Sequence, residues 1–100
     1  MAKKPETVFR ERVHSDLDAI PNSWFETIQQ VCIRGTPDFL GCVNGHFVAL
    51  ELKKDKRGKP EPLQLYNMNQ IENVAGGSAK LVTPENWPRI RRFLNRLASA

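Results

Sequence analysis

Two carboxylates and a lysine stand in a stretch that otherwise has the pattern of apolar β-strands. Asp38 begins the segment DFLGCV, and Glu51 and Lys53 lie near the end of HFVALELK, with Asn44-Gly45 between the two segments. Asn-Gly between two apolar runs predicts a hairpin with a type I′ turn, because that turn needs positive φ at both central positions. Counting back from this two-residue loop puts Asp38 directly opposite Glu51, where like charges repel.

Such a pair needs something that neutralises it. One carboxyl could stay protonated with a raised pKa, or Lys53, which lies on the same sheet face as Glu51, could offset part of the repulsion. A divalent cation could also bind between the two groups, because hard oxygen ligands suit Mg²⁺ or Mn²⁺. The alternative is that Asp38 and Glu51 are solvated at a sheet edge beside an ordinary ion pair.

The same register sorts the apolar residues of the hairpin between the two faces of a sheet. Leu40, Cys42, Phe47 and Ala49 share the face of the two acids, and the other face carries Phe39, Val43, Val48, Leu50 and Leu52. A slip of one residue, or a single β-bulge, would move one carboxylate to the wrong face.

Elements before and after the hairpin must hold it in place. A stripe of Phe9, Val13, Leu17 and Ile20 predicts a helix over 5–20, and β-branched and aromatic residues predict a strand over 24–33. Further along, we expect a helix over 62–75 closed by Gly76 or Gly77, a strand over 78–83, and a last helix from Pro84 capped by Thr83.

This order predicts an α/β fold in one domain, residues 1–100, with a mixed central sheet flanked by helices. On the last helix, Trp87, Ile90, Leu94 and Leu97 form the apolar stripe, whereas Arg89, Arg92 and Arg96 line another face.

The composition is that of an ordinary globular protein, with 100 residues and a formal net charge of +4. The positive charge favours an anionic partner, nucleic acid first and an acidic membrane surface second. There is no secretory signal, no apolar run near the roughly 20 residues that span a bilayer, and no disulfide framework, so we expect a cytoplasmic protein. Cys42 and His46 are better explained by packing and a turn than as metal ligands, because no second pair completes a zinc set.

The chain resembles a known nuclease family at several points in the right order. Pro37-Asp38 followed by Glu51-Leu52-Lys53 resembles the PD-(D/E)XK nuclease signature. PETVF, GTPDFLGCVNGHFVALELKK, PLQ, AGG and TPENW resemble small stand-alone VRR-NUC nucleases of the Holliday junction resolvase-like kind. The similarity extends over nearly the whole chain, and it implies the αβββαβ core of that family with an additional C-terminal helix.

The resemblance also implies roles for single residues. Asp38 and Glu51 would bind Mg²⁺ or Mn²⁺ together with the backbone carbonyl of Leu52, Lys53 would be the catalytic lysine, and Gln64 would be the glutamine of the second helix. Gln64 also lies at helical spacing with Met68, Ile71 and Ala75, which predicts that it points inward and needs a partner. Glu6 would lie near the metal, with Glu11 as its rival, and His14 is not required by the family pattern.

The expected activity is metal-dependent hydrolysis of DNA phosphodiesters, with phosphate contacts from basic residues near the carboxylates. These residues are Arg34, Lys54, Lys56, Arg57 and Lys59, and a second cluster at the N-terminus comprises Lys3, Lys4, Arg10 and Arg12. Nothing resembles a base-reading helix, so branched or four-way junction DNA fits better than a fixed sequence.

Paired cuts in a junction would require a homodimer, to which Trp24, Trp87 or the last helix could contribute. A non-catalytic DNA-binding or adaptor module on the same fold, and an RNA nuclease, are the alternatives.

Overall fold

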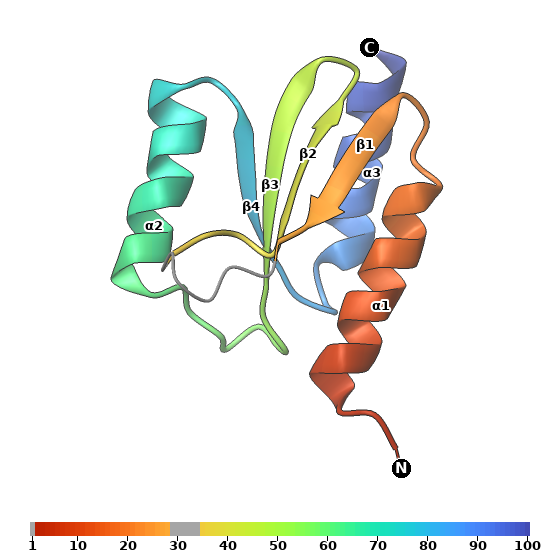
Figure 1. Ribbon diagram of the computed structural model, residues 1–100, viewed down its shortest axis with the longest axis vertical. Helices are drawn as coiled ribbons and strands as arrows, with labels where there is room; N and C mark the ends of the chain where they lie inside the picture. The colour runs from red at the N-terminus through yellow and green to blue at the C-terminus, as the bar shows by residue number, and fades with distance from the viewer. Residues whose placement is uncertain (1, 29–34) are drawn as a thin grey trace.

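Four strands form one mixed sheet at the centre of the computed structural model, which describes residues 2–28 and 35–100 (Figure 1). The elements along the chain are α1 (Pro5–Asp18), β1 (Ser23–Thr27), β2 (Phe39–Val43), β3 (His46–Leu52), α2 (Pro62–Asn69), the π-helix η1 (Gln70–Val74), β4 (Ser78–Val82) and α3 (Trp87–Ser99). Their order, one helix, three strands, a helix, a strand and a helix, is the order that the sequence predicts.

The strands are arranged β1-β2-β3-β4 in the sheet. The first three form an antiparallel meander, and β4 runs parallel to β3 after the crossover through α2 and η1. Helices α1 and α3 lie on one face of the sheet and α2 lies on the other (Figure 1). The predicted fold class, a mixed sheet flanked by helices, is therefore confirmed.

The β2–β3 hairpin has the predicted register and turn. Phe39 pairs with Leu50 and Val43 with His46, and both loop residues have positive φ, 50° at Asn44 and 84° at Gly45. This is the backbone of a type I′ turn, which matches the right-handed twist of the strands. The next position beyond the Phe39–Leu50 pair is Asp38 opposite Glu51, as the sequence analysis requires.

The core lies between the sheet and the α1–α3 layer. The stripe on α1 and its extension to Ile20 are buried, and so are Phe39, Val43, Val48 and Leu50 on one face of the hairpin. The buried apolar side chains of this layer include Phe9, Val13, Leu17, Phe39, Val43, Val48, Leu50, Ile90 and Leu94. Burying one such side chain contributes about 1.5–3 kcal/mol, so this layer carries most of the apolar stabilisation.

Trp87 belongs to this core and is not an exposed aromatic, so the suggestion that it serves a dimer surface is wrong. Its side chain is only 1% exposed. Its indole N–H (Nε1) donates a 2.8 Å hydrogen bond to Oδ2 of Asp16 on α1. Trp24, by contrast, is 63% exposed.

The last helix begins later than predicted. Thr83 and Asn86 close a turn on each other, because Thr83 N–H donates to Asn86 Oδ1 (2.8 Å) and Asn86 N–H donates to Thr83 Oγ1 (3.2 Å). This reciprocal pair holds residues 84–86 as a turn, and α3 starts at Trp87.

The second predicted helix also changes character along its length. It is α-helical over Pro62–Asn69 and then widens into η1, where Ala75 N–H bonds to the carbonyl of Gln70, five residues back. The wider turn rotates Ala75 out of the inward face, and Ala75 is exposed, contrary to the prediction. Gly76 provides the left-handed position after the helix, with φ of 82°.

Two further boundaries differ from the prediction. The first helix ends at Asp18, and Ile20 lies in the following turn. The strand expected over 24–33 runs from Ser23 to Thr27, and residues 29–34, which include Cys32 and Arg34, lie outside the described part of the chain. None of the helices in the described ranges is both long and apolar enough to cross a membrane.

Candidate active site

Asp38 lies immediately before β2, and both oxygens of its carboxylate have partners. Oδ1 accepts a 2.8 Å hydrogen bond from Nη2 of Arg10 on α1, and Oδ2 accepts a 2.7 Å bond from the backbone N–H of Leu52 at the end of β3. The Asp38 side chain is 20% exposed and that of Arg10 is 42% exposed. A half-exposed ion pair of this kind holds the carboxylate in place while leaving it accessible from solvent.

Glu51 lies inside β3 and is 6% exposed. Its Oε2 accepts a hydrogen bond from Nε2 of Gln64 and lies 3.5 Å from Nζ of Lys53. Burial, followed by the neighbouring Asp38 carboxyl, raises the pKa of Glu51 to about 7, and Lys53 opposes this effect. Two acids and one lysine therefore share a partly desolvated site in which the second negative charge is costly.

Gln64 connects the first turn of α2 to this group. Its Oε1 accepts a 2.9 Å hydrogen bond from the backbone N–H of Glu61 and lies 3.4 Å from Nζ of Lys53. Its amide nitrogen points to Glu51, so one side chain caps the helix and contacts both the acid and the lysine. The inward orientation predicted for Gln64 is what the structure has, and Glu51 and Lys53 are its partners.

The chain also matches a solved structure over almost its whole length. A structure described as "VRR_NUC domain" aligns with a TM-score of 0.70 and 19% sequence identity, over 97% of this chain and 97% of that one. This chain has the VRR-NUC fold. The fold implied by the sequence resemblance is thereby confirmed. Protein-family models and curated proteins give no match to the sequence.

Within the VRR-NUC fold of this chain, the carboxylate pair lies where β2 begins and β3 ends, beside the start of α2. No group of three or more His, Cys, Asp or Glu side chains arranged to hold a metal occurs in the ranges 2–28 and 35–100. The available oxygen donors are the carboxylates of Asp38 and Glu51 and nearby backbone carbonyls. One or two carboxylates with retained waters are the usual protein contribution to a Mg²⁺ site, so this donor set fits that ion.

The two rival glutamates of α1 differ in their positions. Glu11 is engaged by Lys3, whose Nζ donates to Oε1 and Oε2 at 2.8 and 2.9 Å. Glu6 is exposed and precedes Arg10 by four residues, so it lies on the same helix face as the arginine that reaches Asp38. His14, also on α1, is exposed and lies near the Phe39 ring, with the ring centroids 6.0 Å apart.

A basic hollow of about 360 Å³ lies beside the catalytic candidates in the VRR-NUC fold. Its lining is formed by Lys53, Lys54, Asp55, Arg57, Gly58 and Lys59. Asp55 accepts hydrogen bonds from the backbone N–H of Arg57 (2.8 Å) and from its guanidinium (3.3 Å), which lower the pKa of Asp55 below its ordinary value. Of the predicted DNA-contact residues, the hollow includes Lys54, Arg57 and Lys59, Lys56 is exposed in the same loop, and Arg34 lies outside the described residues.

Arg10 is the site residue whose place the sequence analysis missed. It was expected in a basic N-terminal cluster that contacts phosphates, but it forms an ion pair with Asp38, 28 positions further along the chain. The signal that could have found it is its position four residues after Glu6, on the helix face that turns towards the hairpin.

Proposed function

We propose that this protein is a metal-dependent endonuclease that hydrolyses DNA phosphodiesters. The observation that supports this most directly is the meeting of the two carboxylates and Lys53. Asp38 is one of the causes of the raised pKa of Glu51, and Nζ of Lys53 lies 3.5 Å from Oε2 of Glu51. Placing two acids and a lysine in a partly buried site costs stability, so a structural role alone does not account for them.

Asp38 and Glu51 would hold Mg²⁺ or Mn²⁺, with the backbone carbonyl of Leu52 as a further ligand and Glu6 reaching the site from α1. When bound, the ion supplies Lewis-acid polarisation of a phosphate oxygen and a lower pKa for water. Glu51 must lose its proton to serve as a ligand, and Lys53 favours that ionised form.

The other side chains of the site orient these groups. Lys53 holds an ammonium charge where negative charge develops on the phosphate, and it can orient the attacking water. Gln64 fixes the rotamer of Glu51 through its amide and positions Lys53 through its carbonyl oxygen. Arg10 holds Asp38 in place before substrate arrives, and the remaining N–H groups of its half-exposed guanidinium can donate to phosphate oxygens.

DNA would lie against the basic hollow after β3. Lys54, Lys56, Arg57 and Lys59 there, together with Arg34, make contacts to phosphates that carry no sequence information. Such contacts predict binding that weakens steeply with salt. Because no helix in residues 2–28 and 35–100 resembles a base-reading helix, we propose branched or four-way junction DNA as the preferred substrate.

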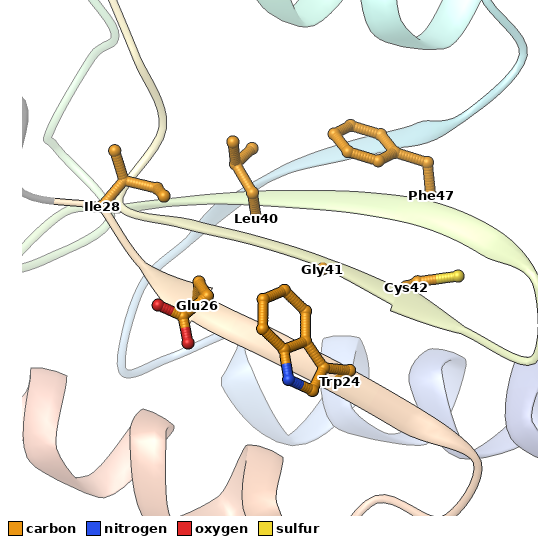
Figure 2. A pocket seen from close by; sticks show the side chains of 7 residues that line it. All are labelled: Trp24, Glu26, Ile28, Leu40, Gly41, Cys42 and Phe47. Atoms are coloured by element: carbon orange, nitrogen blue, oxygen red, sulfur yellow. The ribbon is translucent and has the colours of Figure 1, made fainter.

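Two symmetric cuts need two sites, so we propose a homodimer formed through the uncovered part of the α2 face of the sheet. A hollow of about 390 Å³ there is lined by Trp24, Glu26, Ile28, Leu40, Gly41, Cys42 and Phe47. Figure 2 shows these residues along β1, β2 and β3, with Ile28, Leu40 and Phe47 on the side of the sheet that faces α2. The face is apolar except for Glu26, and it includes the exposed side chains of Trp24 (63%) and Phe47 (44%).

The exposed aromatic side chains mark the surface that the partner would cover. A standard-size interface takes about 800 Å² from each partner, and the exposed side chains of Trp24 and Phe47 belong to the apolar surface that would supply it. Light scattering should therefore give the mass of a dimer, and Trp24→Lys should convert it to a monomer. Val74→Lys, at an exposed apolar position on η1, is the matched control and should leave the dimer intact.

The enzymatic proposal is tested by incubating purified protein with linear and branched DNA in Mg²⁺, Mn²⁺ or EDTA. Cleavage should need the metal, and Asp38→Asn and Lys53→Ala should abolish it while each variant still binds DNA. Metal-independent product, or variants that cut at the parent rate, would contradict the proposed site. Binding without any metal-dependent product on any DNA or RNA would instead identify a non-catalytic DNA-binding module, and a preference for RNA would change the substrate.

A further inference from the structure

Helix α3 carries a second concentration of positive charge, besides the loop after β3. The sequence has 15 basic and 11 acidic residues, and α3 contains four of the basic residues and none of the acidic ones. Outside α3 the two kinds are therefore equal in number, and the net charge of +4 equals the charge of the four arginines on this helix. Helix α3 is thus a positively charged element that can attract an anion in addition to the basic hollow.

Three of the four arginines share one exposed face. Arg89, Arg92 and Arg96 follow each other at three and four residues and are all exposed. At about 100° per residue they lie within roughly 60° of one another around the helix, opposite the buried face of Ile90 and Leu94. The fourth arginine, Arg91, is turned towards the core layer, with its Nη1 3.6 Å from Oδ2 of Asp16.

In the described part of the chain, these three side chains form no ion pair with a carboxylate. Within residues 2–28 and 35–100, Lys3, Arg10, Arg12, Lys53, Arg57, Lys80 and Arg91 form ion pairs, but Arg89, Arg92 and Arg96 do not. An exposed row of unpaired guanidinium groups on a rigid helix can bind an external anion without first breaking a contact.

The row begins at the end of the molecule that holds the candidate active site. The N–H of Lys53 donates to the carbonyl of Val82 at the end of β4 (2.8 Å), and α3 follows that strand after one turn. At the other end, Asn44 in the hairpin loop donates to the carbonyls of Leu97 (3.2 Å) and Ala100 (2.8 Å). Helix α3 therefore extends along the sheet from the site to the hairpin turn, as Figure 1 shows.

We infer that Arg89, Arg92 and Arg96 bind the phosphate backbone of a DNA arm that leaves the active site along α3. The inference rests on the proposed nuclease function and adds a second DNA-contact surface, on the sheet face opposite to α2. Seven residues of helix extend about 10 Å, and one strand of duplex DNA carries a phosphate every 3.4 Å or so along its axis, so the row spans about three phosphates.

The same helix argues against a membrane as the anionic partner. An interfacial helix inserts an apolar face between lipid headgroups. Trp87, Ile90, Leu94 and Ala98 of α3 are buried in the core, and Phe93 and Leu97 pack against it, so the apolar face of this helix is not free to insert. Arginine, whose planar fork matches phosphate oxygens, is also the residue suited to a nucleic-acid backbone.

The test is the salt dependence of DNA binding by a variant with Arg89→Gln, Arg92→Gln and Arg96→Gln. Fluorescence anisotropy with a long duplex and with a four-way junction, in EDTA, gives the slope of log K against log salt for each protein. Loss of three phosphate contacts should lower the magnitude of that slope by about 2.7. The triple Arg→Lys variant should keep the slope, and Arg91→Gln, on the same helix, should leave it unchanged.

An unchanged slope in the triple Gln variant, with a far-ultraviolet spectrum and a melting temperature like those of the parent, would overturn the inference. So would a loss in Arg91→Gln of about one third of that in the triple Gln variant, because a loss proportional to the number of charges removed would reflect total charge and not the row. The measurement contains no metal and no cleavage, so a failure of the proposed nuclease activity would show separately, as intact binding without product.

Discussion

Glu51 should make the stability of the metal-free protein depend on pH in the direction opposite to that of most carboxylates. Its pKa is raised from 4.5 to about 7, first by burial and then by Asp38. Between these two values the folded state holds a proton that the unfolded state has released. The free energy of unfolding should therefore fall as the pH rises from about 4.5 to 7, and the loss should be complete above 7.

The size of the effect follows from the pKa. A shift from 4.5 to about 7 corresponds to about 3 kcal/mol at 1.36 kcal/mol per unit. Glu51→Gln keeps the shape of the side chain and removes the charge, so it should raise the free energy of unfolding at pH 8 by up to about 3 kcal/mol. In a domain of this size, that gain corresponds to an increase in melting temperature on the order of 10 °C.

Urea unfolding in EDTA at a series of pH values between 4.5 and 8 would measure this for the parent and for Glu51→Gln. The difference between the two proteins should be near zero at the acid end and should grow until about pH 7. Glu85→Gln, at an exposed position before α3, is the control and should follow the parent at every pH. Parallel curves for the parent and Glu51→Gln would refute the reasoning, because they would mean that the site accommodates the charge at no cost.

Three other predictions concern the same network and the core. The affinity of the parent for Mn²⁺, measured by calorimetry, should weaken about tenfold per pH unit below 7, because Glu51 must be ionised to bind the ion. An affinity that does not change between pH 5 and 7 would exclude Glu51 as a ligand. Arg10→Ala should tighten Mn²⁺ binding in the absence of DNA, because the guanidinium 2.8 Å from Asp38 competes with the cation. The control Arg12→Ala should leave the Mn²⁺ affinity unchanged. Weaker Mn²⁺ binding by Arg10→Ala would contradict this competition. Trp87→Phe should lower the free energy of unfolding by about 1–3 kcal/mol, since it leaves Oδ2 of Asp16 without the indole N–H. If Trp87→Phe combined with Asp16→Ala costs the sum of the two single changes, the hydrogen bond contributes nothing.

The parts of the structure that could be predicted from the sequence are those with a local cause. Asn44-Gly45 dictates its own turn, and the turn fixes the register that brings Asp38 opposite Glu51. The buried stripe on α1 follows from the spacing of its apolar residues. The inward position of Gln64 follows from helical spacing in the same way.

The remaining features depend on contacts between distant parts of the chain. Arg10 meets Asp38 because α1 packs beside the hairpin, and the indole N–H of Trp87 finds its partner in Asp16, 71 positions earlier in the chain. Helix α3 starts late because Thr83 and Asn86 exchange hydrogen bonds and hold the residues between them in a turn. The preference of threonine for the cap position does not reveal this contact. We have no sequence signal that would have predicted the π-helical end of the second helix.

The amide of Gln64 links helix α2 to the acid of the neighbouring strand. One end of it completes the first turn of α2 through Glu61, and the other end contacts Glu51. Gln64→Ala would therefore destabilise the first turn of α2 and also remove the hydrogen bond to Glu51. Loss of activity in that variant would not show that Gln64 takes part in the reaction. Gln64→Glu retains an acceptor for the backbone N–H of Glu61 and adds a third negative charge beside Asp38 and Glu51. This variant would separate the helix-capping role of the residue from its contact with the acid.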